Sequence, residues 1–187
     1  GDFSSASYFF LAAALCRETV RVENVDARTL QGDVGLLAVL ERLGVEVETS
    51  GRGIRVTGRD LREGPFTFDL GDMPDMVPTL AVLSAVRRGR TVIRNVAHLR
   101  VKESDRLAAL VIELRRVGVH AEELEDGLAI EGGGRLHGAE IETYGDHRIA
   151  MVFAVLGLAV PGIRIADRAC VGKSFPGFWN ELEKWWR

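Results

Sequence analysis

The chain repeats one pattern of apolar and polar segments, and this repetition limits the folds it can adopt more than any other feature. Asp33 aligns with Asp105 and Gly44 with Gly118, about 72 and 74 residues apart. Self-similarity at this spacing indicates one supersecondary unit used several times. The first copy contains SSASYFFLAAAL, TVRVENV, QGDVGLLAVLERLG, VEVETS and GIRVTG; the second contains PDMVPTLAVLSAV, TVIRNV, KESDRLAALVIELRRVG, VHAEEL and GLAIEG; the third contains DHRIAMVFAVLGLAV, GIRIAD and FPGFWNELEKWW.

Two segments of the repeat have the apolar spacing of amphipathic helices. In residues 34–43 and 107–117, apolar side chains recur three and four positions apart, which places them on one stripe of a helix. A glycine follows each segment, and we expect Gly44 and Gly118 to adopt the left-handed conformation that ends a helix.

Three other helical segments are apolar on almost every side. They span residues 5–15, 77–86 and 149–160. In a chain without a membrane span, a helix of this kind is buried on all faces, so we expect these three at the centre of the domain. The amphipathic helices would then lie outside and cover the sheets.

Short segments rich in β-branched residues predict the strands. They cover 45–49 and 54–57, 119–123 and 128–130, and 66–70 between the first two copies. Each copy is then a βαβαββ unit, and we predict one α/β domain: a pseudo-threefold repeat with buried helices and surface sheets, its copies spanning about 1–64, 65–138 and 139–187. Because the first copy lacks a leading strand and the third lacks its last strand pair, we expect the chain to be a portion of a longer polypeptide.

Composition and charge exclude several classes of protein. With 47% hydrophobic and 27% charged residues, the chain can bury a core as one globular domain. A net charge of −3 without a basic tract argues against a nucleic-acid partner. Cys16 and Cys170 are too few for a disulfide framework and lack metal-ligand spacing, which favours a cytoplasmic setting. No apolar run reaches the roughly 18 residues of a membrane span, and the start lacks the basic region of a signal peptide.

A charged segment opens the amphipathic helix of the second copy. If this helix starts near Lys102, then Lys102 and Arg106 share a face and Glu103 projects close by. Two cations and a carboxylate beside free backbone N–H groups suit a multiply charged anion and a proton transfer. The alternative is a solvated helix start with ordinary ion pairs.

Equivalent positions in the repeat carry further charged residues. Asp146, His147 and Arg148 precede the buried helix of the third copy, where unpaired burial is costly, so we expect the histidine and the arginine to point outward. Asp75 holds the matching place in the second copy, and Lys173 follows in the third. Helix capping by the two aspartates and a plain surface lysine are the alternatives. Because the repeat superposes these segments, we expect one anion site with acid–base capacity.

The motifs at these positions resemble a known family. RVKESDR, TYGDHRIAM, MPDM, KSFP, QGD and GDFSSASYF closely resemble the C-terminal domain of EPSP synthases, the 3-phosphoshikimate 1-carboxyvinyltransferases of the shikimate pathway of aromatic amino acid biosynthesis. The resemblance spans essentially the whole chain. It implies six βαβαββ units in two pseudo-threefold domains, of which this chain would be the second.

The resemblance also implies a reaction. These enzymes transfer the enolpyruvyl group of phosphoenolpyruvate to the 5-hydroxyl of shikimate 3-phosphate, through a tetrahedral intermediate and without a metal or organic cofactor. Arg106, Arg148 and Lys173 match the cations that bind phosphoenolpyruvate. Asp75 and Lys102 match positions that contact shikimate 3-phosphate, with Asp75 as the base near the attacking hydroxyl.

Other positions match less directly. Glu103, with Lys173 as a possible partner, matches the acid–base group at the methylene carbon, and His147 lines the same pocket. His98 stands where many relatives have Asn or Ser in contact with the substrate. The family's other domain carries half of the active site, so we expect this chain alone to have negligible activity.

Two other functions fit part of the pattern. A UDP-N-acetylglucosamine enolpyruvyl transferase would share the repeat but needs a reactive cysteine in a loop of its own, and neither Cys16 nor Cys170 lies in such a loop. A non-catalytic module that binds anions would avoid extra carboxylates such as Asp75 and Glu103.

Overall fold

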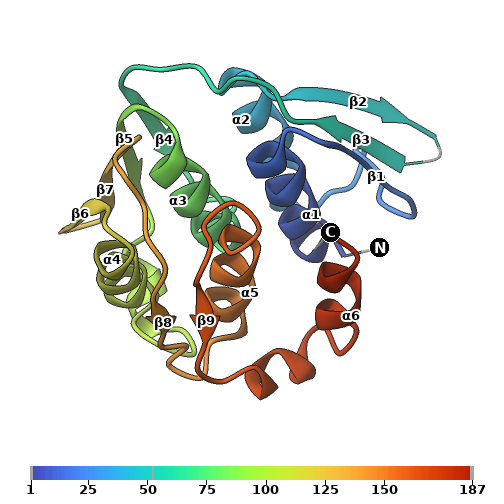
Figure 1. Ribbon diagram of the computed structural model, residues 1–187. Helices are drawn as coiled ribbons and strands as arrows, with labels where there is room; N and C mark the ends of the chain where they lie inside the picture. Colours follow the sequence, from blue (N-terminus) through green and yellow to red (C-terminus); the bar gives the residue numbers. More distant parts are fainter. Residues whose placement is uncertain (1, 52, 186–187) are drawn as a thin grey trace.

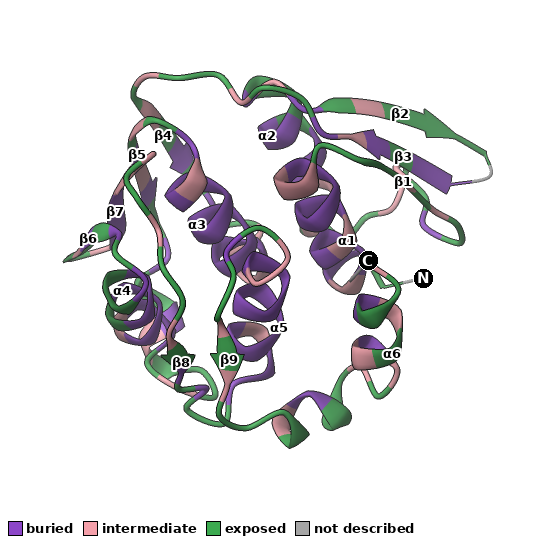
Figure 2. Ribbon diagram, viewed as in Figure 1, coloured by how far each residue is buried: buried purple, intermediate pink, exposed green. Residues whose placement is uncertain are grey.

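Three helices form the centre of the structure: α1 (Phe3–Cys16), α3 (Val77–Val86) and α5 (His147–Leu156) (Figure 1). The computed structural model describes residues 2–51 and 53–185. Each central helix contacts the other two, and almost every residue of the three is buried (Figure 2). Because all faces of these helices meet protein, no polar stripe is needed, and the prediction of a helical centre is confirmed.

The outer helices lie on the periphery (Figure 1). They are α2 (Leu36–Arg42), α4 (Arg106–Arg116) and α6 (Phe178–Glu183), accompanied by four short 3₁₀ segments: η1 (Gly32–Gly35), η2 (Pro74–Met76), η3 (Ala97–Val101) and η4 (Ala169–Lys173). Gly44 follows α2 with φ +96° and Gly118 follows α4 with φ +94°, as predicted. Within the described residues, no helix is both long and apolar enough to cross a bilayer.

The strands form three sheets in the described part of the chain. The first has the order β1 (Thr19–Val22), β3 (Gly53–Thr57), β2 (Glu46–Ser50), and the second β4 (Phe66–Asp69), β5 (Gly89–Arg94), β7 (Gly127–Gly132), β6 (His120–Leu124). The third pairs β8 (Glu140–Ile141) with β9 (Arg164–Ile165).

The pairing of the strands repeats along the chain. In the first sheet β3 lies antiparallel between β1 and β2, and in the second β7 lies antiparallel between β5 and β6. β4 pairs with β5 in parallel, and β8 pairs with β9 in the same way. The internal similarity read from the sequence thus reappears in how the strands pair.

The three central helices point in the same direction. At their N-terminal ends, the Ser7 and Thr79 hydroxyls lie 3.1 Å apart, and Arg148 Nη1 donates to the Tyr8 hydroxyl over 3.4 Å. At the opposite end, residues from the last turns of α1 and α3 line one common cavity. The partial positive charges of three helix N-termini therefore meet at one end of the domain.

Candidate active site

A buried arginine organises the N-terminal end of the central helices. Arg106 opens α4 and is 1% exposed. Its Nε donates to Asp146 Oδ2 over 2.8 Å, its Nη2 to Glu103 Oε2 over 2.7 Å and its Nη1 to Asp75 Oδ1 over 3.3 Å. A desolvated guanidinium is stable only when its donors are satisfied in this way. Three carboxylates from separate elements therefore converge on one side chain.

Asp146 joins this cluster to the start of α5. It is fully buried and caps the helix by accepting from the Arg148 backbone N–H over 2.9 Å. Ser104 Oγ donates to it as well, over 3.2 Å. Burial opposes ionisation, but the hydrogen bond and charge of Arg106 outweigh burial and hold the pKa of Asp146 below its usual value. The capping reading of Asp146 is confirmed, and the same carboxylate also belongs to the charged cluster.

Asp75 bridges two arginines. Arg148 Nη2 donates to Asp75 Oδ2 over 2.7 Å, while Arg106 reaches the other carboxylate oxygen. Asp75 lies inside η2, whose preceding residue Met73 makes no side-chain cap, and α3 begins without a side-chain cap too. The alternative that Asp75 caps a helix is wrong, because its carboxylate is committed to the guanidinium groups.

His147 and Arg148 do not point into solvent, contrary to the expectation from sequence. His147 is 8% exposed, and the side chain of Arg148 is 13% exposed. Arg148 is buried at low cost because Asp75, Ser4 Oγ and the Tyr8 hydroxyl accept its hydrogen bonds. Burial, followed by the charge of Arg148, lowers the pKa of His147. Its buried Nδ1 has no hydrogen-bond partner within the described residues.

The segment before α4 differs from the prediction. Asp105 caps the helix by accepting from the Ala108 N–H over 3.0 Å, so α4 begins at Arg106 and not near Lys102. Lys102 is exposed, and it does not share a helix face with Arg106. Glu103 is held by Arg106; burial raises its pKa, but a hydrogen bond from its own backbone N–H and the charge of Arg106 prevail and lower it.

Lys173 and His98 complete the set of predicted residues. Lys173 is exposed at the end of η4, and its charge adds to the burial and the Arg148 charge that lower the pKa of His147. His98 is exposed in η3 and makes no hydrogen bond or ion pair to the cluster in the described part of the chain. The structure therefore brings together Asp75, Glu103, Arg106, His147, Arg148 and Lys173, places Lys102 beside them, and leaves His98 apart.

The sequence reasoning missed polar groups from the first copy. Ser4 and Tyr8 both contact Arg148, and burial raises the pKa of Tyr8 to about 12 although Arg148 opposes the shift. Asp33 lies in η1, which contacts η2, the segment that holds Asp75. Burial and then the charge of Asp75 raise the pKa of Asp33. The QGD motif at residues 31–33 was the sequence signal that could have pointed to Asp33. A side chain at Gly32 would collide with the Asp72 carbonyl, so glycine lets η1 approach η2.

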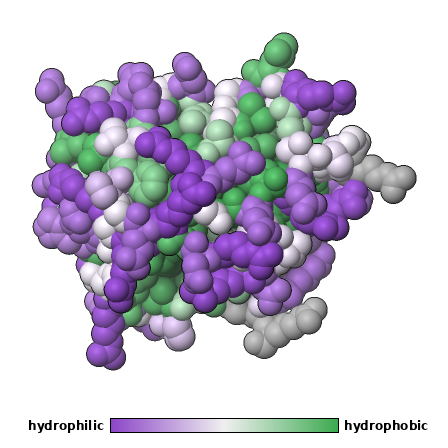
Figure 3. All heavy atoms as spheres, turned by 90° about the horizontal axis from the view of Figure 1, so that it is seen from above, coloured by the Kyte–Doolittle hydropathy of each residue, from purple (hydrophilic) through white to green (hydrophobic). Residues whose placement is uncertain are grey.

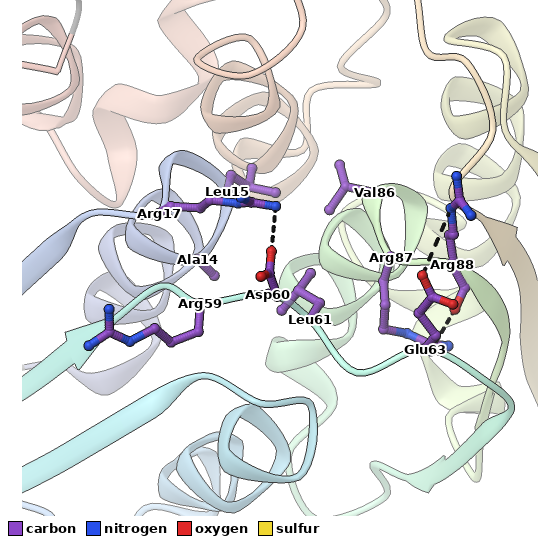
Figure 4. Close-up of a pocket in the computed structure, with 10 residues that line it drawn as sticks. All are labelled: Ala14, Leu15, Arg17, Arg59, Asp60, Leu61, Glu63, Val86, Arg87 and Arg88. Atoms are coloured by element: carbon purple, nitrogen blue, oxygen red, sulfur yellow. Dashed lines mark hydrogen bonds and ion pairs between the residues drawn. The ribbon is translucent and has the colours of Figure 1, made fainter.

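A cavity of about 310 Å³ lies at the other end of α1 and α3 (Figure 4). Two ion pairs join charged side chains around it: Arg17 Nη2 lies 2.6 Å from Asp60, and Arg88 Nε lies 3.9 Å from Glu63. These helices end toward the top of Figure 1, and seen from above this side shows hydrophobic patches between hydrophilic side chains (Figure 3). Helix C-termini repel anions, so we place the anion chemistry at the opposite end.

The polar cluster is suited to anionic ligands. Arg106, Arg148 and Lys173 supply positive charge beside helix N-termini, and the carboxylates of Asp75 and Glu103 are about one-third exposed and able to exchange protons. In residues 2–51 and 53–185, no group of three or more His, Cys, Asp or Glu side chains is arranged to hold a metal ion. The arrangement can bind a compound with several negative charges and move a proton on it.

Comparison with known proteins points to one family. The family model described as EPSP synthase (3-phosphoshikimate 1-carboxyvinyltransferase) matches residues 1–182. The 3-phosphoshikimate 1-carboxyvinyltransferases of Syntrophobacter fumaroxidans and Nostoc punctiforme are 51% and 47% identical to the chain over 185 and 181 residues. These alignments cover 98% and 97% of this chain but 43% and 42% of the relatives. The chain thus spans less than half the length of the relatives it matches.

Solved structures show the same relation. The EPSP synthase from Acinetobacter baumannii is similar with a TM-score of 0.80 and 31% identity, over 97% of this chain and 44% of that one. The enolpyruvyl transferase NikO from Streptomyces tendae is similar with a TM-score of 0.71 over 98% of this chain and 42% of the other, and at 22% identity this likeness concerns the fold alone. The chain is an α/β domain that matches about half of this fold.

Proposed function

The chain belongs to the EPSP synthase (3-phosphoshikimate 1-carboxyvinyltransferase) family, and we propose that it forms part of an enzyme that makes EPSP from phosphoenolpyruvate and shikimate 3-phosphate. In the proposed reaction the 5-hydroxyl oxygen bonds to C2 of phosphoenolpyruvate, its proton leaves, and a proton adds to C3. The tetrahedral intermediate then loses phosphate and a C3 proton. The observation that carries this proposal is the convergence of Asp75, Arg106 and Arg148 at one end of the domain.

The arginines and Lys173 would hold phosphoenolpyruvate. This substrate carries a carboxylate and a phosphate, and guanidinium groups bind both in a forked geometry. Arg148 keeps some exposure, and its contacts to Tyr8 and Ser4 are long, at 3.4 Å each, so these donors can turn to an anion. Cations held beside the ligand stabilise the charge that develops in the transition state.

Asp75 would take the proton of the attacking hydroxyl. Its carboxylate is anchored by Arg106 and Arg148 and is 35% exposed, so part of it stays accessible to a substrate. Lys102, which is exposed next to Glu103 in the sequence, would contact shikimate 3-phosphate. Anchoring the base while leaving an edge open satisfies the geometric requirement for general base catalysis.

Glu103 and Lys173 would serve the proton at C3. Glu103 is oriented by Arg106 over 2.7 Å and is 37% exposed, and its charge also acts on His147. The charge of Lys173 acts on His147 as well, so both candidates lie near this residue. His147 would line the pocket.

The finer architecture is part of the proposal. We place three βαβαββ copies, spanning about 1–64, 65–138 and 139–187, around a pseudo-threefold axis, and we assign the chain to the C-terminal half of the family fold. The repeated strand pairing supports this arrangement. The second half of the active site would come from the N-terminal domain of the family.

A chimera tests the function. The chain replaces the matching 185 residues of the Syntrophobacter fumaroxidans relative, and EPSP formation from the two substrates is measured. We expect turnover by the chimera, at least about tenfold less turnover when Asp75→Asn is introduced, and negligible turnover by the chain alone. A chimera that folds and binds both substrates but never forms EPSP would favour a non-catalytic anion-binding module and refute the proposal.

A further inference from the structure

Glu113 is a carboxylate that the proposed reaction does not use. It lies in α4 and is 0% exposed, although a charged side chain without partners is costly to bury. It stands seven residues after Arg106, which is two turns along the same face of the helix. The burial of Glu113 on the helix face that also carries Arg106 therefore needs compensating partners.

The partners of Glu113 lie in the loop that leads into α5. Its Oε1 accepts from the Tyr144 hydroxyl over 2.8 Å, and its Oε2 accepts from the Glu142 backbone N–H over 3.2 Å. The Arg116 guanidinium, one turn later in α4, forms an ion pair with Oε2, with Nε 3.2 Å away. Three partners satisfy the buried charge, and two of them belong to the loop immediately before Asp146.

This loop adopts a conformation that needs support. Tyr144 has φ +57°, a left-handed conformation that costs a residue with a side chain about 1 kcal/mol or more, and Gly145 follows with φ +68°. Such backbone persists only where its surroundings hold it. The Tyr144 hydroxyl is suited to this task, because partial burial and then the hydrogen bond and charge of Glu113 raise its pKa to about 12 and keep it protonated.

Two side chains of α4 therefore bind the segment 142–148, at two separate places. Arg106 holds Asp146 over 2.8 Å, and Glu113 holds Tyr144 and Glu142 two turns further on. A single attachment would fix the distance of the segment from α4, while two attachments also fix its rotation.

We propose that Glu113, acting through Tyr144, is a positioning residue that sets the orientation of His147 and Arg148 at the start of α5. The geometric claim concerns this chain alone. Its consequence for catalysis rests on the proposed function, because Arg148 must face Asp75 and the ligand at the same time. Removing the Tyr144 hydroxyl should let the left-handed turn relax and rotate the two residues that follow Asp146.

The test uses NMR spectra of the chain without ligand. The probes are the ring signals of His147, identified with His147→Asn among the four histidines, and the Nε–H signal of buried Arg106. Tyr144→Phe and Glu113→Gln are compared with Thr91→Val, which removes a buried 2.7 Å hydrogen bond to Arg87 away from the site. We expect both loop variants to shift the two probes and Thr91→Val to leave them in place.

Two readouts separate this inference from the proposed function. If Tyr144→Phe, which is the milder change should Glu113→Gln not fold, leaves the His147 and Arg106 signals at their wild-type positions, the positioning role is overturned. In the chimera we expect Tyr144→Phe to lower kcat about tenfold while Thr91→Val does not. Probe shifts in the chain together with an inactive wild-type chimera would refute only the proposed function, whereas an active chimera with unchanged kcat in Tyr144→Phe would refute the catalytic consequence.

Discussion

Asp75 in η2 and Arg148 at the start of α5 form a 2.7 Å ion pair, although they stand 73 positions apart in the sequence. Each stands at the entry to a central helix. The carboxylate and the guanidinium meet because the central helices begin at the same end of the domain. Each charged side chain is stabilised in its partly buried position by the opposite charge of the other.

This pair predicts a linked effect of Asp75 on function and stability. Asp75→Asn keeps the shape but leaves Arg148 and Arg106 short of one negative charge, so we expect the free energy of unfolding to fall by about 1–3 kcal/mol. Urea unfolding of the chain measures this change. The matched control is Asp72→Asn, an exposed neighbour for which we expect a change within about 0.5 kcal/mol. Equal effects of the two substitutions would contradict the pairing.

Arg106 is expected to be the most sensitive residue of the cluster. Replacement by methionine leaves buried Asp146 without its strongest partner, and breaking a buried pair in this way typically costs about 3–5 kcal/mol. Arg106→Lys should recover only part of the loss, because one ammonium cannot reach three carboxylates in a fork. Chemical unfolding is the measurement. Arg90→Gln is the control, because the Arg90 side chain is 44% exposed in its ion pairs, and we expect a loss below about 1 kcal/mol.

His147 should make stability depend on pH. Its pKa is lowered in the folded chain, so the unfolded state binds more protons below the unfolded pKa of about 6.5. Stability from keeping His147 neutral is therefore complete above pH 6.5 and is lost as the pH falls from there toward the folded pKa. Urea midpoints between pH 8 and 5 should fall more for the wild type than for His147→Gln. Parallel curves would show that another group carries the dependence.

Asp146 should act in the same direction at lower pH. Its pKa is held below the usual value in the folded state, so the contribution of its ionised form is present above about pH 4 and is lost as the pH falls through the folded pKa. In Asp146→Asn this acid-dependent loss should be absent, and the variant should already be destabilised at pH 7 because Arg106 lacks a charge partner. Unfolding followed from pH 5 to 2 measures the difference.

Local pattern predicted the framework of this chain and missed the pairing of its charges. The central helix 77–86 was predicted to the residue, and Gly44 and Gly118 end their helices in the left-handed conformation, because apolar spacing and caps are local signals. The start of α4 was misplaced because Lys102 and Asp105 both fit a helix entry, and only the cap geometry distinguishes them. Burial of Arg148 could not be foreseen, since its acceptors come from residues 4, 8 and 75.

Arg87 leads to a prediction at the opposite end of the domain. It is 1% exposed, has no carboxylate partner within the described residues, and donates to the carbonyls of Arg62 and Gly64 over 3.0 and 2.7 Å and to Thr91. It therefore ties the connection between β3 and β4 to the end of α3. Figure 4 labels the Arg87 side chain among those that line the cavity. Arg87→Met leaves these partly buried carbonyls without this donor, a loss of up to about 1 kcal/mol for each such group.

The expected result is local opening of that connection. Hydrogen exchange at the Gly64 amide, which bonds to the Arg88 carbonyl over 3.1 Å, should become faster in Arg87→Met, while the Nε–H signal of Arg106 stays in place. Arg88→Met is the matched control, because Arg88 is exposed and its ion pair to Glu63 is 3.9 Å long, so exchange at Gly64 should change little. Unchanged exchange in Arg87→Met would show that the connection is held by its backbone hydrogen bonds alone.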